Sequence, residues 1–467
     1  MEDGGLKRVL GFREALTINL GAIIGAGIFV IIGIAAFDAG PALIVAIIVS
    51  AIVAMLTGLS FSQIATRVQK EGGSYEYAKE TLNPFSGFVA GWMWTFGNII
   101  AISAVAISLG GYFNSLFHTS FPTIYLAIIA IVAFASLNIF GVKNSAKTIA
   151  YLVAVNIAIL AVFIIAGLTD FHAGNFSGFF NKGSGGILSG AALIFFAFTG
   201  FSSVTTVSGE VKDPERTIPR AIVYSILISS LLYVGIAVVL IGLIPASSLS
   251  STSSPLSLGI SALHNPYLDI IIAVGGITAT AGVTLTGLLG TSRVLFAMSR
   301  DNELPEKISK IDRFSTPVYA IIISAVLGII FITFVSFVTI VEAANASVLI
   351  AYIIINFAAF YERYIKDKVS EEDTKHRKIL GKYFIAVPLL GIGTIIMTLY
   401  FLGLYSLEVS GLILVVGVAY FILKLGLERT GKKKRSKKHV PIYSKVRAFG
   451  KSRSLKQIKE DNVSVHN

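Results

Sequence analysis

The residues best suited to binding chemistry lie in one stretch near the N-terminus, Gly21-Ala-Ile-Ile-Gly25-Ala-Gly27-Ile-Phe29. Glycine within a helix costs about 1 kcal/mol relative to alanine, so these glycines favour unwinding of the apolar segment that contains them. Inside a bilayer, unwound backbone is tolerated only where protein buries it or where it lines a cavity. The N–H groups that begin the second half of an interrupted helix bind anions such as carboxylates. The stretch therefore predicts a binding site for a carboxylate.

A second apolar segment is interrupted in a similar way, in Ile194-Phe-Phe-Ala-Phe-Thr-Gly200-Phe-Ser-Ser203. Two broken helices at the membrane midplane are typical of proteins that hold a solute and ions between them. The pair Gly21 and Gly25 alone would also suit a small-xxx-small face on which helices pack. The third glycine, Gly27, and the second interruption favour a binding site over simple packing.

The composition is that of a membrane protein. The 467 residues are 54% hydrophobic and 14% charged, with a mean hydropathy of +0.79, whereas soluble domains are about 25% charged. The absence of cysteine excludes disulfides, thiolate metal sites and cysteine nucleophiles. All histidines fall in predicted loops or in the tail, so we expect neither a metal site nor a cofactor.

Apolar runs of about 20 residues are long enough to cross a bilayer. We expect an all-α integral membrane protein with twelve spans near 14–37, 40–62, 84–112, 121–141, 148–168, 187–209, 219–244, 267–298, 317–338, 342–362, 383–404 and 410–427. The two interruptions lie in spans one and six and therefore enter the membrane from opposite sides. This spacing predicts an inverted repeat of five plus five spans with discontinuous helices 1 and 6, and two extra C-terminal helices.

Basic residues predict the orientation, because cytoplasmic loops are rich in lysine and arginine. With the N-terminus in the cytoplasm, 37 of the 38 basic residues fall on the cytoplasmic side, and only Lys182 lies outside. We therefore expect a multi-pass protein of the cell membrane with both termini in the cytoplasm. The basic tail is interpreted as an anchor beside anionic lipid and not as a nucleic-acid site.

The predicted organisation is one membrane domain followed by a tail. The domain covers 1–427, with repeat one at about 12–168, repeat two at about 187–362 and the extra helices at about 383–427. The tail, 428–467, is polar and highly charged, and we expect it to be disordered.

Four motifs together resemble the amino acid–polyamine–organocation transporter superfamily, and within it the prokaryotic amino acid permeases. The similarity extends over at least the first ten spans. The motifs are the glycine stretch at 21–29, Gly72-Gly-Ser-Tyr75-x-Tyr77 with Gly91-Trp92, Gly209-Glu-Val-Lys-Asp-Pro-Glu-Arg-Thr-Ile-Pro-Arg-Ala221, and Arg300-Asp-Asn-Glu-Leu-Pro305.

The resemblance implies a bundle that exposes one central site alternately to each side of the membrane, with an amino acid as the solute. It also implies roles for individual positions. Backbone amides of Gly25, Ala26 and Gly27 would hold the substrate carboxylate, carbonyls of Ile23, Phe196, Ala197 and Thr199 would hold its ammonium group, and Phe196, Phe198 and Ser202 would line the side-chain pocket or gate.

The chain departs from the family pattern at two positions. Asn156 stands where proton-coupled members carry a lysine, and an asparagine cannot carry the proton; it could equally be a hydrogen-bonded packing residue. Ser202 stands where many relatives have an acid, which argues against cationic substrates. Thr280 and Thr284 on span eight are possible ligands for an ion or a water molecule.

Ionisable residues in spans mark proton relays, and here Glu14, Glu210 and Glu342 all lie at span ends. Arg216 and Arg220 are the candidate partners of Glu210. We therefore favour an exchanger of neutral amino acids over a proton- or sodium-coupled symporter, both of which stay open. An intramembrane enzyme is less favoured, since no histidine or aspartate lies mid-span. A channel would need a polar pore ring, whereas two broken helices suit an enclosed site. A transporter of polyamines or other organic cations is less favoured because carboxylates are absent from mid-membrane. The sequence leaves the oligomeric state open.

Overall fold

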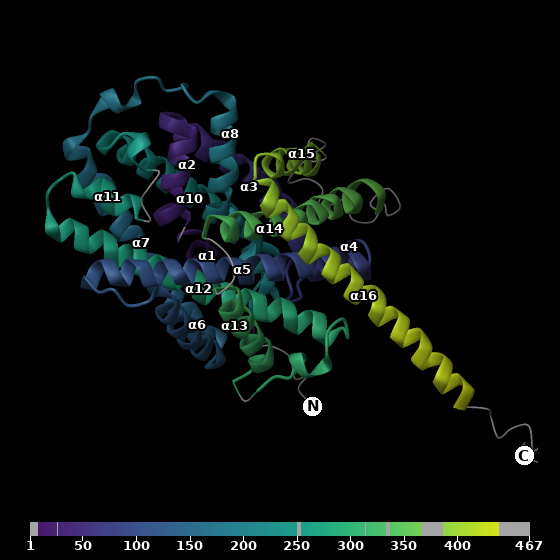
Figure 1. Cartoon of the computed structure of the whole chain (residues 1–467). Coiled ribbons are helices and arrows are strands. Elements are labelled where there is room, and N and C mark those ends of the chain that lie inside the picture. Colours follow the sequence, from purple (N-terminus) through teal and green to yellow (C-terminus); the bar gives the residue numbers. More distant parts are fainter. Residues whose placement is uncertain are drawn as a thin grey trace, which may run out of the picture. The chain divides into compact units, whose positions relative to one another are not determined.

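The structure is a computed structural model that describes residues 8–25, 27–249, 254–312, 314–332, 337–366 and 386–438. Within these ranges the chain is helical (Figure 1), and its sole β-type pairing is an isolated parallel bridge between Leu10 and Val211. The α-helices are α1 (Phe12–Ile23), α2 (Ile32–Ala39), α3 (Leu43–Ala65), α4 (Ser74–Thr81), α5 (Pro84–Phe117), α6 (Thr123–Ile139), α7 (Val142–Gly167), α8 (Gly183–Ile194), α9 (Ser203–Thr206), α10 (Pro214–Leu243), α11 (Pro255–Ser261), α12 (Pro266–Arg300), α13 (Val318–Ile332), α14 (Phe337–Tyr361), α15 (Ala386–Tyr400) and α16 (Leu404–Lys438). Short 3₁₀ or π segments are η1 (Gly27–Ile31), η2 (Gly40–Ala42), η3 (Leu168–Asp170), η4 (Ala173–Phe176), η5 (Phe195–Ser202), η6 (Ser208–Glu210), η7 (Ala246–Leu249), η8 (Glu306–Ser309) and η9 (Glu362–Lys366).

The helices confirm an all-α membrane fold, and each predicted span coincides with helical residues. Eight helical stretches of the described chain are long and apolar enough to cross a membrane, and the first, Phe12–Ala65, covers two predicted spans. Three shorter apolar helices, α6, α13 and α15, coincide with three more. Because the described parts of those three helices are shorter than a full crossing, the total of twelve spans stays a prediction.

Local sequence explains where the longest helices begin. Asn83 caps α5 by accepting a hydrogen bond from the N–H of Ser86, and Pro84 occupies the first helical position. Asn265 and Pro266 start α12 in the same way, with the Asn265 side chain accepting from the N–H of Tyr267. Asparagine at the cap and proline at the first position are the preferred start of a helix.

Two elements outside the predicted spans have functional interest. The helix α4 lies in the loop between predicted spans two and three, and α11 precedes α12. At the other end of the chain, α16 continues to Lys438, so residues 428–438 are helical where the sequence predicted a disordered tail, and 439–467 lie outside the described residues. Residues 418–438 belong to a second unit of the chain, separate from the unit that ends at Gly417, and within the described part this second unit is a single helix.

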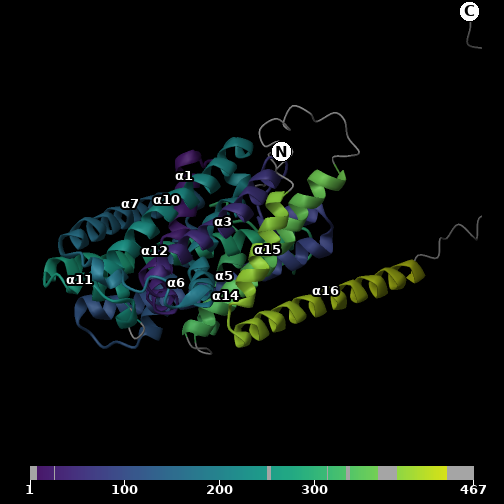
Figure 2. The ribbon, with the colours of Figure 1, turned by 90° about the horizontal axis from the view of Figure 1, so that it is seen from above.

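Helix packing within the first unit surrounds the interrupted segments. The long helix α5 packs against α12 and α14, and α10 packs against α3 and α1 (Figures 1 and 2). The interrupted segment α1 also contacts α7, α12 and η5. The two interruptions are therefore held within one helical bundle.

Candidate functional site

The first interruption is a true break in the helix. The helix α1 ends at Ile23, Ile24 is extended with φ −79° and ψ 93°, and π-helical turns begin at Gly27. Among the described residues, neither Gly25 nor Gly27 donates a backbone hydrogen bond, and the first amides after the break, those of Ile28 and Phe29, both donate to the carbonyl of Gly25. The break thus leaves amides available to an anion, as the glycines predict.

The second interruption takes a different form. Between α8 and α9 the chain is wound into a 3₁₀ helix, η5, over Phe195–Ser202, and is not fully unwound. In a 3₁₀ helix each carbonyl bonds the N–H three residues later and not four, with poorer geometry, so the carbonyls of η5 depart from regular α-helical bonding. The Thr199 hydroxyl donates to the carbonyl of Phe196 at 2.9 Å, which shows that this carbonyl faces a side chain.

The two interruptions touch each other directly. A Cβ placed on Gly27 would lie 2.2 Å from the Cβ of Ala197, and one placed on Gly200 would lie 2.4 Å from the carbonyl carbon of Ala22. Residues 22 to 27 therefore run past 200 to 197 in antiparallel directions. Only glycine permits this approach, because any side chain would force the two backbones apart.

A small cavity lies at this crossing. Its volume is about 30 Å³, which is room for a water molecule. Four of the predicted site residues line it, Ile23, Gly27, Phe196 and Thr199, together with Asn98 of α5. The sequence analysis missed Asn98, because nothing in an apolar helix sequence indicates which polar residue faces a site.

Two buried tyrosines hold the carbonyls around the crossing. The Tyr233 hydroxyl donates to the carbonyls of Ile23 and Ala197, at 2.7 and 3.2 Å, and thereby links both interruptions. The Tyr352 hydroxyl donates to the carbonyl of Thr199 at 2.6 Å. Each carbonyl keeps a second lone pair for another donor. Neither tyrosine carries a local sequence signal, since both lie on distant apolar helices.

Some predicted site residues lie away from the cavity. The Phe198 ring packs against the ring of Tyr233 with centroids 5.2 Å apart. Ser202 is buried, accepts from the Trp94 indole at 3.2 Å and bonds the Tyr352 hydroxyl at 2.8 Å. Neither Phe198 nor Ser202 is among the described residues that line the cavity. Their gating roles remain predictions, and Ala26 lies outside the described residues.

The two threonines suggested as ion ligands bond to their own helix. Thr280 donates to the carbonyl of Gly276 at 2.7 Å, and Thr284 donates to that of Thr280 at 2.9 Å. Threonine commonly bonds back to its own helix in this way. Their hydroxyl oxygens retain acceptor capacity, so a role in binding an ion stays a prediction.

Asn156 is buried at the interface of α7 and α12. Its carbonyl oxygen accepts a hydrogen bond from the Thr278 hydroxyl at 2.5 Å. One turn before it on α7, Val153 lies against Gly21, and one turn after it Ile159 lies against Gly275 of α12, which also contacts Phe29. Asn156 therefore lies level with the first break, and its hydrogen bond fits both a packing role and a role beside the site.

The predicted partners of Glu210 are wrong. Glu210 forms a fully buried ion pair with Arg293 of α12, with Nε and Oε1 3.0 Å apart, and not with Arg216 or Arg220. The carbonyl of Glu210 also accepts the N–H groups of Val9 and Leu10. The sequence did not indicate this pair, because Arg293 lies 83 positions from Glu210. The rotation of α12 decides that Arg293 faces the protein interior.

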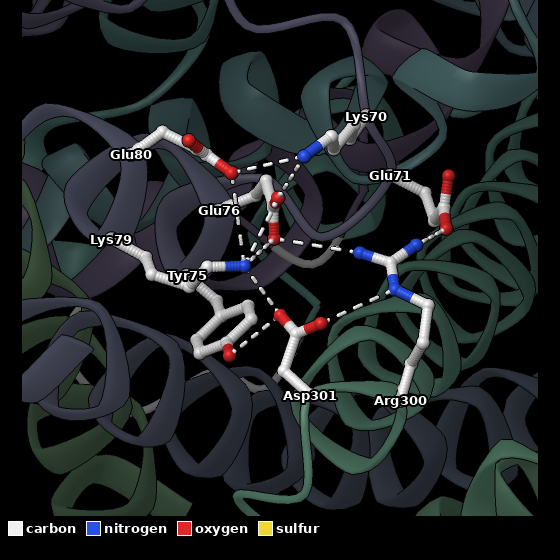
Figure 3. A network of polar contacts seen from close by, with 8 residues as sticks. All are labelled: Lys70, Glu71, Tyr75, Glu76, Lys79, Glu80, Arg300 and Asp301. Atoms are coloured by element: carbon white, nitrogen blue, oxygen red, sulfur yellow. Dashed lines mark hydrogen bonds and ion pairs between the residues drawn. The ribbon is translucent and has the colours of Figure 1, made fainter. Parts of the chain in front are cut away.

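Residues of two of the four family motifs meet in one ionic network at the end of α12 (Figure 3). Asp301 accepts from the Lys79 ammonium at 2.5 Å and from the Tyr75 hydroxyl at 2.9 Å. Arg300 pairs with Glu71 and lies 3.5 Å from Glu76. A third motif borders this network, because Gly209 lies against the Glu71 carboxylate.

Positive backbone angles make the glycines of the second motif necessary here. Gly72 and Gly73 have φ of 120° and 51°, which side chains rarely adopt. Added Cβ atoms would lie 2.7 Å from Ala297 of α12 and 2.9 Å from Thr205 of α9. The Gly72-Gly73 turn, which begins α4, therefore packs closely between α9, the helix that follows the second interruption, and α12.

The charged residues of the network shift one another's pKa values. Burial alone would raise the pKa of Asp301, but hydrogen bonds from Lys79 and Tyr75 lower it below its ordinary value. Burial raises the pKa of Glu76, and the Lys79 charge opposes that rise. The stabilisation from Asp301 is thus present above its ordinary pKa of 3.8 and is lost only as pH falls through its lower folded pKa. The Asp301 contacts hold at neutral pH.

Comparison with known proteins shows the family to which this chain is similar. The family model for amino acid permeases matches residues 14–432. The chain is 30% identical over 381 residues to the branched-chain amino acid permease BcaP of Bacillus subtilis, covering 77% of this chain and 82% of that protein. It is 25% identical over 447 residues to BcaP of Lactococcus lactis, covering 90% and 95%. It is also 29% identical over 418 residues to a methylthioribose transporter of Bacillus subtilis, covering 85% and 88%.

Proposed function

Because this chain belongs to the amino acid permease family, we propose that it is a secondary active transporter of neutral amino acids that works by alternating access. The observation that carries the proposal is the contact of the two interruptions at Gly27 and Ala197. It brings free amides of one helix beside carbonyls of the other. An α-amino acid carries the matching carboxylate and ammonium groups.

The proposed binding mode follows from those backbone groups. The amides of Gly25, Ala26 and Gly27 hold the carboxylate, and the carbonyls of Ile23, Phe196, Ala197 and Thr199 hold the ammonium group. The helix dipoles favour this polarity, since a broken helix presents positive charge at its N-terminal end and negative charge at its C-terminal end. The small volume of the cavity requires its walls to move outward when a substrate enters.

The substrate class follows from the uncharged wall. Isoleucine, phenylalanine, valine and alanine side chains line the cavity, and its polar side chains are neutral among the described residues. A carboxylate that would select cationic amino acids is replaced by Ser202. Both relatives named BcaP are branched-chain amino acid permeases, and we propose branched-chain amino acids as the preferred group.

The proposed transport mode is exchange. Asn156 does not titrate, so the position that carries the proton in coupled relatives cannot do so here. An exchanger returns to its starting state by carrying a second substrate back. Proton-coupled or sodium-coupled uptake is the competing mode.

The test is uptake of radiolabelled leucine, valine, lysine and methylthioribose into proteoliposomes that contain the purified protein. We expect leucine and valine uptake that requires unlabelled amino acid inside the vesicles. A pH gradient or a sodium gradient alone should not drive it. Uptake driven by a pH gradient in empty vesicles would contradict exchange, and uptake of methylthioribose without leucine would contradict an amino acid substrate.

A further inference from the structure

The helices around the central crossing include two groups whose members pack closely on one another. We call α1, α2, α3, α8 and α10, together with η5, the interrupted group, because both broken segments belong to it. The helices α5, α6, α12 and α13 form the continuous group, and all four contribute to one hydrophobic core. The cavity at the crossing is lined by both groups, with Gly27 and Phe196 from one and Asn98 and Val283 from the other. A path to this cavity therefore opens where the two groups separate.

Tyr112 of the continuous group contacts the first interrupted segment just after its break. Its hydroxyl donates to the carbonyl of Phe29 at 2.6 Å, and both side chains are buried. The two rings meet edge to face with centroids 6.2 Å apart. An added Cβ on Gly276 of α12 would overlap the Tyr112 ring, and one on Gly275 would lie 3.1 Å from the Phe29 ring. Both rings are thus enclosed between α5, α12 and η1, and we call their hydrogen bond and ring pair the tyrosine contact.

The tyrosine contact and the buried pair of Glu210 with Arg293 lie on opposite sides of the cavity. Gly276, at the tyrosine contact, and Val283, in the cavity wall, both belong to α12, as does Arg293. Along this helix Gly276 precedes Val283 by about 10 Å, and Arg293 follows it by about 15 Å. By the predicted topology the tyrosine contact is on the outer side of the cavity and the ion pair is on the cytoplasmic side.

A comparison with Tyr233 shows what is particular about Tyr112. The Tyr233 hydroxyl donates to the carbonyls of Ile23 and Ala197, which both lie in the interrupted group, as does Tyr233 itself on α10. These bonds persist when the two groups separate. The Tyr112 hydroxyl instead donates from one group to the other. Its bond must therefore break when the groups separate on the outer side.

We propose that Tyr112 is a positioning residue that closes the outer path to the amino acid site. The inference rests on the proposed transport by alternating access, in which one bundle of helices rocks against another. Closure seats the Tyr112 hydroxyl on the carbonyl of Phe29, and opening exposes both groups. A hydrogen bond of this kind shifts an equilibrium by about two- to tenfold. Loss of the hydroxyl therefore raises the population of the outward-open state and still permits closure.

The test uses a single introduced thiol, since the native chain has no cysteine. Val283→Cys places the thiol in the wall of the central cavity, and a membrane-impermeant methanethiosulfonate is added to one face or the other of membrane vesicles. The outer face is the one from which Ser184→Cys is labelled. Adding Tyr112→Phe keeps the ring and removes only the hydroxyl. We expect labelling of position 283 from the outer face at least threefold faster than in the parent variant, with no acceleration from the inner face.

Two further variants complete the experiment. Tyr267→Phe is the matched control, because it makes the same change in an exposed tyrosine near the start of α12 and should leave the labelling rate unchanged. Gly276→Ala adds a methyl group that displaces the Tyr112 ring, and it should also accelerate labelling from the outer face. If Tyr112→Phe does not fold, as judged by size-exclusion chromatography, Gly276→Ala decides the question.

Labelling needs no amino acid, so it tests the closure separately from the substrate. Faster outer labelling in Tyr112→Phe, together with an absence of leucine uptake by the wild type, would support the closure and contradict the proposed substrate. Equal outer labelling in Tyr112→Phe and in the parent variant would overturn the proposal. Equal acceleration from both faces would also overturn it, because that result indicates a general loosening of the packing.

Discussion

At the scale of single residues, the most constrained positions are the glycines where the two interruptions meet. Gly27 lies against Ala197 and Gly200 lies against Ala22, in both cases closer than a side chain allows. Tyr233 links both interruptions, because its hydroxyl donates to one carbonyl in each of them. The site is therefore built from backbone groups, and side chains mainly set the spacing between them.

The substitution Gly27→Ala tests this spacing. An added methyl group would overlap Ala197, and overpacking of this kind costs about 1–3 kcal/mol. We expect amino acid uptake at least tenfold lower than wild type, with the protein still folded. The control is Gly393→Ala, because a Cβ at that position meets nothing within 4 Å. Radiolabelled uptake and size-exclusion chromatography measure the two properties, and equal uptake by both variants would show that Gly27 only packs helices.

At the scale of elements, contacts of Glu210 connect the end of the second interrupted segment to α12 and to the start of the chain. Glu210 pairs with Arg293 inside the protein, and its carbonyl pairs with Val9 and Leu10. The Gly72-Gly73 turn adds α4 to the same junction. These contacts join helices that carry the first and second interruptions to a helix that carries neither.

The substitution Glu210→Leu tests the buried pair. It leaves the Arg293 charge unpaired away from water, which costs about 3–5 kcal/mol. We expect a markedly lower melting temperature in detergent, and partial recovery in the double variant Glu210→Leu with Arg293→Leu. The matched control Glu306→Leu removes an exposed carboxylate and should leave the melting temperature unchanged. Strictly additive effects of the two single variants would show that the pair contributes no coupling.

At the scale of the whole molecule, the distribution of basic residues predicts which side faces the cytoplasm. The absence of native cysteine makes this testable with single introduced thiols. Ser184 and Lys310 are both exposed, and the predicted topology places them on opposite sides of the membrane. We expect a membrane-impermeant maleimide to label Ser184→Cys and not Lys310→Cys in intact cells. Labelling of Lys310→Cys alone would reverse the orientation.

Local composition was sufficient to determine several properties of this protein. The lengths of the apolar runs indicate where the membrane helices lie, and the glycines at 21, 25 and 27 indicate the first break, because both effects act between near neighbours in the chain. Residues 194–203 likewise show where the second segment is interrupted, but not that it winds into a 3₁₀ helix. Family membership also follows from the order of the four motifs.

Tertiary structure alone decided which distant groups meet. The partner of Glu210 is Arg293 instead of an arginine in its own motif, and the carbonyls of the site are held by Tyr233 and Tyr352 from other helices. The physical reason is that the rotation of each apolar helix is set by its neighbours, and a helix that is hydrophobic all round carries little record of which face points inward.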